Sequence, residues 1–240
     1  MTIRLRWFPP SWVQLEAGGA VVYIDPAYLS SYFKGHPGHV EFSRWPDAID
    51  GLPEAKMAAG DLVLLTHDHK DHCKKVTVDR LCRKDTLVAG PKRCEKPLGP
   101  RLRVVTEGDE FTAAGFRVRA VPAYNTEAGR STKKAHVRGR GVGYLLARGG
   151  ITLYHAGDTD LIPEMEDLGP VDVALLPIGG TFTMDLDEAI EAALRIKPKL
   201  AIPMHHLRRA DPAEFAARLN ARTKRKAARA LGIGEAVELG

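Results

Sequence analysis

Short runs of apolar residues, or of alternating apolar and polar residues, recur along the chain between glycines, prolines and aspartates, a pattern typical of β-strands. In the first half of the chain these runs predict strands at residues 3–7, 12–16, 20–25, 61–66, 85–89, 102–105, 110–113 and 116–121. In the second half they predict strands at residues 142–148, 151–155, 171–177 and 199–203. The chain is therefore expected to be rich in β-sheet.

Helical periodicity indicates three segments. The first covers residues 72–83. The second covers residues 185–196, has acidic residues in its first turn, where they stabilise a helix N-terminus, and stops before Pro198. The third runs from Asp211 to about residue 229, with proline at the favoured first helical position.

Two long segments lack either periodicity and are expected to be loops. Residues 26–60 are irregular and rich in glycine, proline, tyrosine and histidine, while residues 123–141 are polar, basic and rich in glycine. Loops of this length inside a compact domain are often functional. No linker of serine, glycine or proline divides the chain, so one domain is expected.

Composition is that of an ordinary globular protein, with 44% hydrophobic and 27% charged residues, and no apolar run approaches the roughly 18 residues of a membrane span. Charges interrupt the N-terminal segment where a signal peptide would have its apolar core. We therefore expect a cytoplasmic protein without a membrane partner. The cysteines, Cys73, Cys82 and Cys94, fit no zinc-ribbon spacing and are expected to be reduced.

Polar side chains of the kinds that bind metals follow three predicted strands, directly after Leu65, Tyr154 and Ile202. Polar groups that leave the same edge of a sheet converge on a shared site. The repeated arrangement predicts a cleft at strand ends.

The sequence His-x-His-x-Asp-His at residues 67–72 carries the most specific chemistry. Imidazole and carboxylate groups are the usual ligands of zinc and also suit iron and manganese. In a tight turn His67 and His69 can face one ion while Asp71 and His72 face a second. A histidine-rich surface loop is the alternative, but three of the nine histidines lie within these six residues, which favours a metal site.

The segment Thr-His-Asp-His-Lys-Asp-His at residues 66–72 resembles the signature of the metallo-β-lactamase-fold hydrolases. Residues 154–159 are similar to the Gly-Asp-Thr element of that superfamily, and residues 203–205 to its last metal-binding histidine. Together they resemble the branch that includes bacterial L-ascorbate-6-phosphate lactonase. The resemblance runs from Asp25 to about Phe215. It implies an α/β fold, a four-layer αββα sandwich that forms a single domain over residues 1–240.

The resemblance also implies a ligand set for two divalent ions, with zinc favoured and manganese or iron as alternatives. The residues it assigns are His67 and His69 for the first metal, Asp71, His72 and His205 for the second, and Asp158 as the bridge. Asp71 and Asp158 are also the candidate catalytic groups, because either could hydrogen-bond a metal-bound hydroxide and move its proton.

Two departures from the family pattern stand out. The family supplies a third histidine to the first metal in the segment that corresponds to residues 122–125, which contains no histidine here. Asn125, or His136 from the following loop, are the candidates for that place, as a metal ligand or a substrate contact. The lactonase branch also has Gly-His near its N-terminus, where this chain has residues 8–12, Phe-Pro-Pro-Ser-Trp.

The predicted activity is hydrolysis of a small anionic ester or lactone by a metal-bound hydroxide, because a metal lowers the pKa of bound water from roughly 16 to roughly 7. The net charge of +5 attracts anionic partners. Part of that charge lies in the second loop, whose candidate substrate-binding residues are Lys133, Lys134, Arg138 and Arg140. A solvated basic loop is the alternative reading of these four residues.

Two other functions stay open. The first is a phosphodiesterase or nuclease of the same superfamily; the basic charge favours it slightly, but the chain is too short for the inserted domain of the large nucleases. The second is a non-catalytic metal-binding protein. The sequence also leaves open whether the chain forms a homo-oligomer.

Overall fold

The computed structural model describes residues 2–33, 57–206 and 209–240, so most of the predicted loop at residues 26–60 lies outside the described part. The chain divides into two compact units. The first unit comprises Met1–Val105, Thr112–Gly115 and Leu231–Gly240, and the second comprises Thr106–Phe111 and Phe116–Ala230. Each unit is built around one mixed β-sheet with few helices, which confirms the predicted α/β class. The single domain over residues 1–240 stays a prediction.

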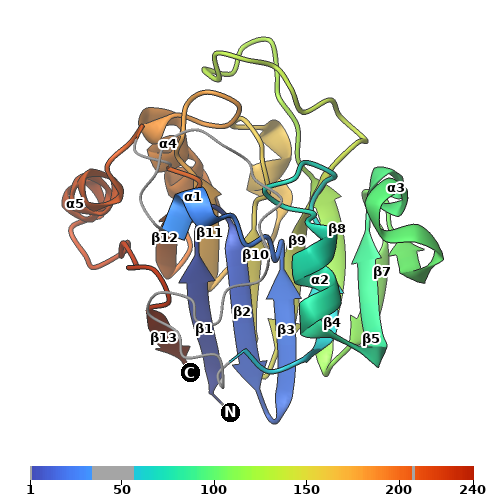
Figure 1. Ribbon diagram of the computed structural model, residues 1–240. Coiled ribbons are helices and arrows are strands. Elements are labelled where there is room, and N and C mark those ends of the chain that lie inside the picture. The colour runs from blue at the N-terminus through green and yellow to red at the C-terminus, as the bar shows by residue number, and fades with distance from the viewer. Residues whose placement is uncertain (1, 34–56, 207–208) are drawn as a thin grey trace. The chain divides into compact units, whose positions relative to one another are not determined.

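The sheet of the first unit has seven strands within the described residues, in the order β13-β1-β2-β3-β4-β5-β6 (Figure 1). Its strands are β1 (Ile3–Phe8), β2 (Trp12–Ala17), β3 (Ala20–Ile24), β4 (Gly60–Leu64), β5 (Cys82–Gly90), β6 (Leu102–Val104) and β13 (Ala236–Leu239). Strands β13 to β3 pair antiparallel, whereas β3 to β6 pair parallel. The parallel strands therefore present their carboxyl ends at one edge.

A glycine pair forms one tight hairpin in each unit. Gly18 and Gly19 join β2 to β3 with φ angles of 52° and 82°, and Gly149 and Gly150 form the corresponding turn in the second unit with φ angles of 59° and 81°. Two-residue hairpin turns with positive φ at both positions strongly favour glycine, which has no Cβ to clash. The hairpin expected around residues 148–150 is thus confirmed.

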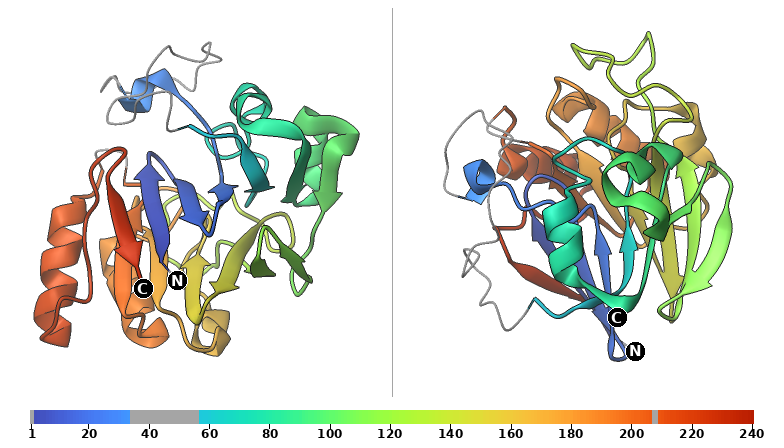
Figure 2. Two further views of the ribbon diagram at one scale, coloured as in Figure 1. Left: turned by 90° about the horizontal axis from the view of Figure 1, so that it is seen from below. Right: turned by 45° about the vertical axis from the view of Figure 1, so that its right-hand side comes forward.

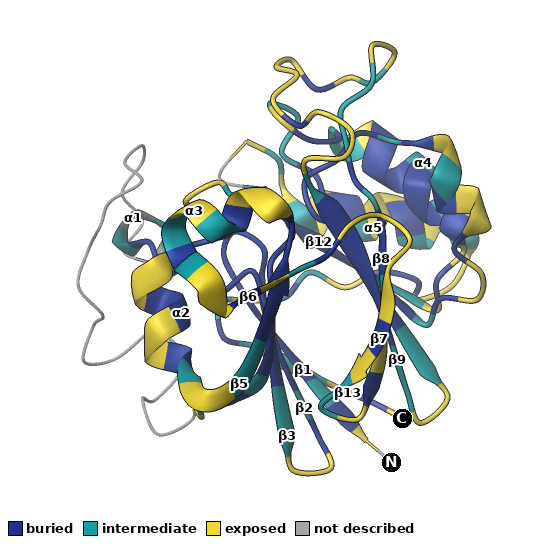
Figure 3. Cartoon of the chain, turned by 90° about the vertical axis from the view of Figure 1, so that its right-hand side faces the viewer, coloured by how far each residue is buried: buried dark blue, intermediate teal, exposed yellow. Residues whose placement is uncertain are grey.

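One hydrophobic cluster fixes helix α2 (Lys75–Leu81) on the sheet of the first unit. The cluster combines Phe8, Trp12, Tyr23, Val63, Leu65 and Val88 with Val78 and Leu81 of the helix. Figure 3 shows buried and exposed positions alternating around α2. Because burial of each such aliphatic side chain contributes about 1.5–3 kcal/mol, this face holds the helix in place.

Helix α2 starts three residues later than the sequence predicts. The backbone N–H groups of His72 and Cys73 both donate to the carbonyl of His69, at 3.0 and 2.8 Å, and Lys74 has an extended backbone. Residues 69–73 therefore form a turn before the helix begins. The consequence is that His72 belongs to a turn and not to the helix.

The second sheet, formed mainly by strands of the second unit, has six strands among the residues described, in the order β12-β11-β10-β9-β8-β7. Its strands are β7 (Glu110–Ala113), β8 (Phe116–Pro122), β9 (Val142–Arg148), β10 (Ile151–His155), β11 (Val173–Pro177) and β12 (Leu200–Met204). Strands β10, β11 and β12 run parallel. Their carboxyl ends, which carry the segments after Tyr154 and Ile202, consequently lie at the same edge, as predicted.

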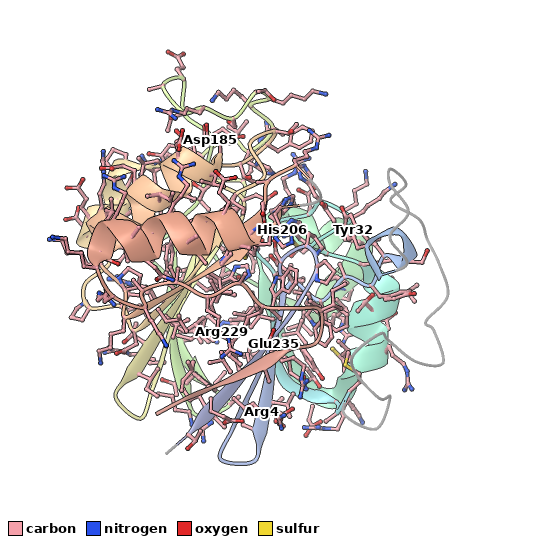
Figure 4. The ribbon with its side chains drawn as sticks, turned by 90° about the vertical axis from the view of Figure 1, so that its left-hand side faces the viewer. Arg4, Tyr32, Asp185, His206, Arg229 and Glu235 are labelled. Carbon is pink, nitrogen blue, oxygen red and sulfur yellow. The ribbon has the colours of Figure 1, made fainter. Side chains whose placement is uncertain are left out.

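Helices α4 (Leu186–Ile196) and α5 (Pro212–Thr223) contact each other, and they pack on β11 and β12 respectively. Asp185 lies at the start of α4 (Figure 4), where its carboxylate accepts a hydrogen bond from the N–H of Glu188. Asp211 caps α5 in the same way through the N–H of Ala213. Both caps satisfy N–H groups that have no partner inside the helix.

The prediction that the last helix reaches residue 229 is wrong, because α5 ends at Thr223. Lys224 has a left-handed backbone, and the following residues pair with the edge strand β12. The N–H of Ala201 donates to Ala227 at 2.7 Å, and the N–H of Arg229 donates to Ala201 at 3.1 Å. Hydrogen bonds to the sheet edge replace the last helical turns.

Strand β13 and the short helices α1 (Ser30–Phe33) and α3 (Glu95–Leu98) are not among the elements predicted from the sequence. The same holds for the 3-10 helices Lys92–Cys94, Gly99–Arg101 and Pro163–Asp167. Each of these elements is only three to five residues long, which is too short to show a period.

No helix within the described ranges combines the length and the apolar character of a membrane span. The cytoplasmic location stays a prediction. The formation of a homo-oligomer stays open.

Substitution of the cap of α4 tests how the second unit is stabilised. We expect Asp185→Ala to lower the free energy of unfolding by about 1 kcal/mol, because it leaves the N–H of Glu188 without its acceptor. Asp185→Asn, which keeps an acceptor oxygen, should lose much less. Urea unfolding followed by circular dichroism measures both, and equal losses in the two variants would contradict the capping role.

Candidate metal centre

The first ligand group is the turn that follows β4 in the first unit. The rings of His67 and His69 have centroids 4.6 Å apart, and those of His67 and His72 are 4.0 Å apart. His67 and His72 are buried, Asp71 is half-buried and His69 is exposed. The structure thus gathers the three imidazoles of the sequence motif into one cluster.

Thr66 and the buried Asp25 fix the orientation of two of these imidazoles. The Thr66 N–H donates to Asp25 Oδ1 at 2.7 Å, and its hydroxyl donates to Asp25 Oδ2 at 2.6 Å. His72 Nδ1 lies 2.7 Å from Asp25 Oδ2, and His67 Nδ1 lies 3.0 Å from the Thr66 hydroxyl oxygen. Because the carboxylate only accepts and the hydroxyl proton is committed to it, Nδ1 is the donor in both rings. In the neutral form of each ring, Nε2 is then the nitrogen that keeps the lone pair.

Asp25 is not part of the ligand set predicted from the sequence. It follows β3, it is fully buried, and its own N–H donates to the carbonyl of Leu64 at 2.9 Å. Its φ of 48° lies in the left-handed region, which aspartate tolerates better than most residues. The sequence signal that points to it is an aspartate at the end of a buried strand.

The second ligand group lies in the second unit and centres on Asp158, just beyond β10. His205 Nε2 lies 3.2 Å from Asp158 Oδ2, and His136 Nε2 lies 3.4 Å from the same oxygen. All three side chains are buried. His205 has a φ of 54°, and a Cβ atom at Gly179 would clash with its carbonyl oxygen, so only glycine fits there.

His136 and Asn125, the two candidates for the missing family histidine, have different places in this group. The N–H of His136 donates to Asn125 Oδ1 at 2.8 Å, and the N–H of Asn125 donates to the carbonyl of His136 at 2.7 Å. The Asn125 amide also donates to Asp160 Oδ1 at 3.1 Å and to the Phe182 carbonyl at 2.8 Å. Asn125 therefore holds the backbone of His136, while the imidazole of His136 faces Asp158.

The hydrogen bonds of His136 also fix its ring. Its Nδ1 lies 3.0 Å from the carbonyl oxygen of Phe182, which can only accept, so Nδ1 carries the proton. In the neutral ring, Nε2 is then the nitrogen with the lone pair. His136 matches His67 and His72 in this respect.

Two further histidines lie close to the ligand residues in sequence. The N–H of Gly157 donates to Nδ1 of the buried His155 at 3.3 Å, so His155 supports the turn before Asp158. His206 lies beyond the end of β12 (Figure 4), and burial, followed by the neighbouring His205, lowers its pKa to about 4. Its imidazole is therefore neutral at pH 7.

The basic loop of residues 123–141 gives its cations different surroundings, although Figure 3 shows much of it exposed. Lys134 Nζ lies 3.1 Å from the buried carboxylate of Asp160. Arg138 pairs with Glu107 at 2.9 Å and with Glu164 at 2.8 Å. Lys133 and Arg140 are exposed. The substrate-binding role of these residues stays a prediction. Two of the four, Lys134 and Arg138, form ion pairs that fix the loop.

The donor sets of both groups consist of imidazole nitrogens and carboxylate oxygens, the chemistry that suits zinc, iron and manganese. In these groups His67, His72 and His136 have their rings oriented by hydrogen bonds to Thr66, Asp25 and the Phe182 carbonyl respectively. Such support is usual around metal-binding histidines, which donate their second ring N–H to a carboxylate or a carbonyl.

Comparison with known proteins agrees with this chemistry. Residues 4–205 match the family described as Beta-lactamase superfamily domain. A protein of Nitratidesulfovibrio vulgaris named UPF0173 metal-dependent hydrolase is 36% identical over 221 residues, which cover 85% of this chain and 80% of the relative.

Two solved structures are similar over nearly the whole chain. A protein of Parabacteroides distasonis has a TM-score of 0.77 and 28% identity, with 96% of this chain and 93% of that chain covered. The metallo hydrolase Igni18 of Ignicoccus hospitalis has a TM-score of 0.73 and 26% identity, with 100% and 99% covered. These likenesses confirm the predicted metallo-β-lactamase type of fold. The chain belongs to the beta-lactamase superfamily and, within it, to the UPF0173 metal-dependent hydrolases.

Proposed function

We propose that the chain is a metal-dependent hydrolase with a binuclear centre that cleaves a small anionic ester or lactone. The proposed ligands are His67, His69, Asp71 and His72 from the first unit and Asp158, His136 and His205 from the second. Family membership supports the joining of the two groups into one centre. Zinc suits this donor set, as do manganese and iron.

The observation that carries the proposal is the shared hydrogen-bond pattern of three buried histidines. His67, His72 and His136 each direct Nδ1 to a protein oxygen, at distances of 3.0, 2.7 and 3.0 Å. In each neutral ring Nε2 is thereby left as the nitrogen able to bind a metal. Two of these oxygens belong to the Thr66 hydroxyl, which donates to Asp25, and to Asp25 itself. Hydrogen bonds of the folded chain therefore fix the orientation of these rings.

A bound divalent ion would supply a hydroxide at neutral pH by lowering the pKa of coordinated water. The protein's own contribution is to hold the ligand nitrogens and carboxylates in place and to move a proton. Asp158 carries a carboxylate oxygen that His136 and His205 both face, so it is the proposed bridging group. Asp71, half-buried in the turn of the first unit, is the proposed proton carrier together with Asp158.

The substrate class follows from charge and from the resemblance to the lactonase branch. The net charge of +5 favours an anionic substrate. Esters and lactones are electrophiles that a hydroxide can attack without a serine or cysteine nucleophile. The proposal therefore needs no residue beyond the two ligand groups and a binding surface for the anion.

Metal content gives the most direct test. We expect protein purified without added metal to contain close to two ions of zinc, manganese or iron per chain. His69→Ala removes a ligand of the first unit, and Asp158→Ala removes the bridge in the second, so both should lower the content. Elemental analysis after gel filtration measures the ratio of metal to protein.

A matched control is Val76→Ala, which shortens an exposed side chain of α2 and should leave the content unchanged. About one ion per chain would exclude a binuclear centre. Absence of metal, with reconstitution also failing, would overturn the proposal as a whole.

His136 and Asn125 allow the ligand and its support to be separated. We expect His136→Ala to remove one ion from the centre because it deletes a ligand. Asn125→Ala should keep the ion but weaken its affinity by roughly 10- to 100-fold, as is usual for groups that orient a ligand. Competition with a chromogenic chelator measures both affinities.

The control for this pair is Val137→Ala, an exposed neighbour of His136 on the same loop. It tests whether any change in the loop disturbs the metal. Unchanged affinity in His136→Ala would show that the histidine is not a ligand.

A further inference from the structure

The turn formed by Thr181 and Phe182 lies directly beside the second ligand group. The carbonyl of Phe182 accepts hydrogen bonds from His136 Nδ1 at 3.0 Å and from the Asn125 amide at 2.8 Å. The backbone of this turn is thus one hydrogen bond away from a proposed metal ligand.

Two cations from separate loops meet at this turn. The N–H of Lys133 donates to the carbonyl of Thr181 at 2.7 Å, and its ammonium nitrogen lies 5.6 Å from the centre of the Phe182 ring. The guanidinium of Arg209 donates to the Thr181 hydroxyl. Arg209 is anchored by its own N–H, which donates to the carbonyl of His206 at 2.8 Å.

These two cations differ from most basic residues around them. Lys134 pairs with Asp160, Arg138 pairs with Glu107 and Glu164, and Arg130 pairs with Asp187 at 3.2 Å. Within residues 57–206 and 209–240, no carboxylate forms an ion pair with Lys133 or Arg209. Their charges are therefore not neutralised by this part of the chain.

Exposed apolar side chains lie in the same segments as these charges. Phe182 is 38% exposed and Val137 is 49% exposed, and they are two of the three large hydrophobic side chains exposed among the described residues. The Phe182 carbonyl accepts the hydrogen bond from His136 Nδ1, and Val137 directly follows His136 in the chain. Binding sites for small molecules combine such apolar surface with a few placed polar groups.

We propose that Lys133, Arg209 and Phe182 form the surface that recognises the substrate, and that the substrate carries a carboxylate or phosphate attached to an apolar or aromatic group. This inference rests on the proposed function and specifies its substrate class. Arg209 offers a planar fork of donors to the oxyanion, Lys133 a compact charge, and Phe182 the ring that contacts the apolar part. Lys133 belongs to the predicted basic loop, whereas Arg209 lies outside the residues predicted from the sequence.

Direct binding tests the proposal without requiring the true substrate. The probes are benzyl phosphate, methyl phosphate, phenylacetate and neutral benzyl alcohol, titrated by calorimetry into the protein as purified with its metal. We expect Lys133→Ala and Arg209→Ala each to weaken the anionic probes about tenfold, the effect of losing one charge-assisted hydrogen bond at a partly exposed site. Phe182→Ala should weaken benzyl phosphate more than methyl phosphate.

Lys84→Ala is the matched control, since it removes one exposed positive charge from β5 in the first unit. Lys133→Arg keeps the charge and should retain binding, which separates recognition from a folding defect. The comparison of the phosphate and carboxylate probes decides which oxyanion the surface prefers. Affinities in Lys133→Ala and Arg209→Ala that equal the affinity in Lys84→Ala would overturn the proposal.

The same titrations on protein whose metal content has been measured keep this inference apart from the proposed function. Tenfold weaker anion binding in Lys133→Ala and Arg209→Ala supports the recognition surface even in a preparation that contains no metal. A full metal complement with equal affinities in all variants would leave the hydrolase proposal standing and remove this one.

Discussion

The hydrogen bonds of Asp25 are the interaction on which the first half of the candidate centre depends. A fully buried carboxylate is costly unless its oxygens are compensated, and here the Thr66 N–H, the Thr66 hydroxyl and His72 Nδ1 all bond to it. The parallel pairing of β3 with β4 brings the end of one strand beside the start of the motif that follows the other. Compensation of one buried charge thereby sets the ring orientation of His72 directly and that of His67 through Thr66.

The second unit also contains a buried carboxylate whose oxygens accept several hydrogen bonds, and here the link to the ligand runs through more residues. The buried carboxylate of Asp160 accepts from the Asn125 amide, from the Thr126 N–H at 2.9 Å and from Lys134. Asn125 then holds the backbone of His136, whose ring faces Asp158. A long loop, which would otherwise position a ligand poorly, is fixed at its base by one buried acid. This explains how a histidine eleven residues beyond Asn125 reaches the ligand group while most of the intervening residues stay exposed.

Much of this arrangement could be predicted from the sequence, because the signals are local. Residues 67–72 and residues 157–159 each contain their metal-binding side chains within a few positions, and the apolar runs before them locate the strand ends. His136 could only be named as an alternative, since its approach to Asp158 depends on contacts with Phe182, 46 positions away. Asp25 is 47 positions from His72 and shows no motif. The end of α5 was misplaced for a similar reason: pairing of residues 227–229 with Ala201 outweighed helix propensity.

The basic loop shows why charge read from a sequence does not identify binding residues. Lys133 and Lys134 are adjacent and chemically identical, yet one ammonium lies against the buried Asp160 and the other over an exposed ring. The Asp160 carboxylate lies 26 positions from Lys134, and the Phe182 ring lies far along the chain from Lys133, so no local pattern records either contact. Arg209 lies outside the loop altogether but reaches the same turn through Thr181. Only the cations that form no ion pair within the protein are available to a substrate. Tertiary structure, and not the density of lysine and arginine in the sequence, therefore determines which residues recognise an anion.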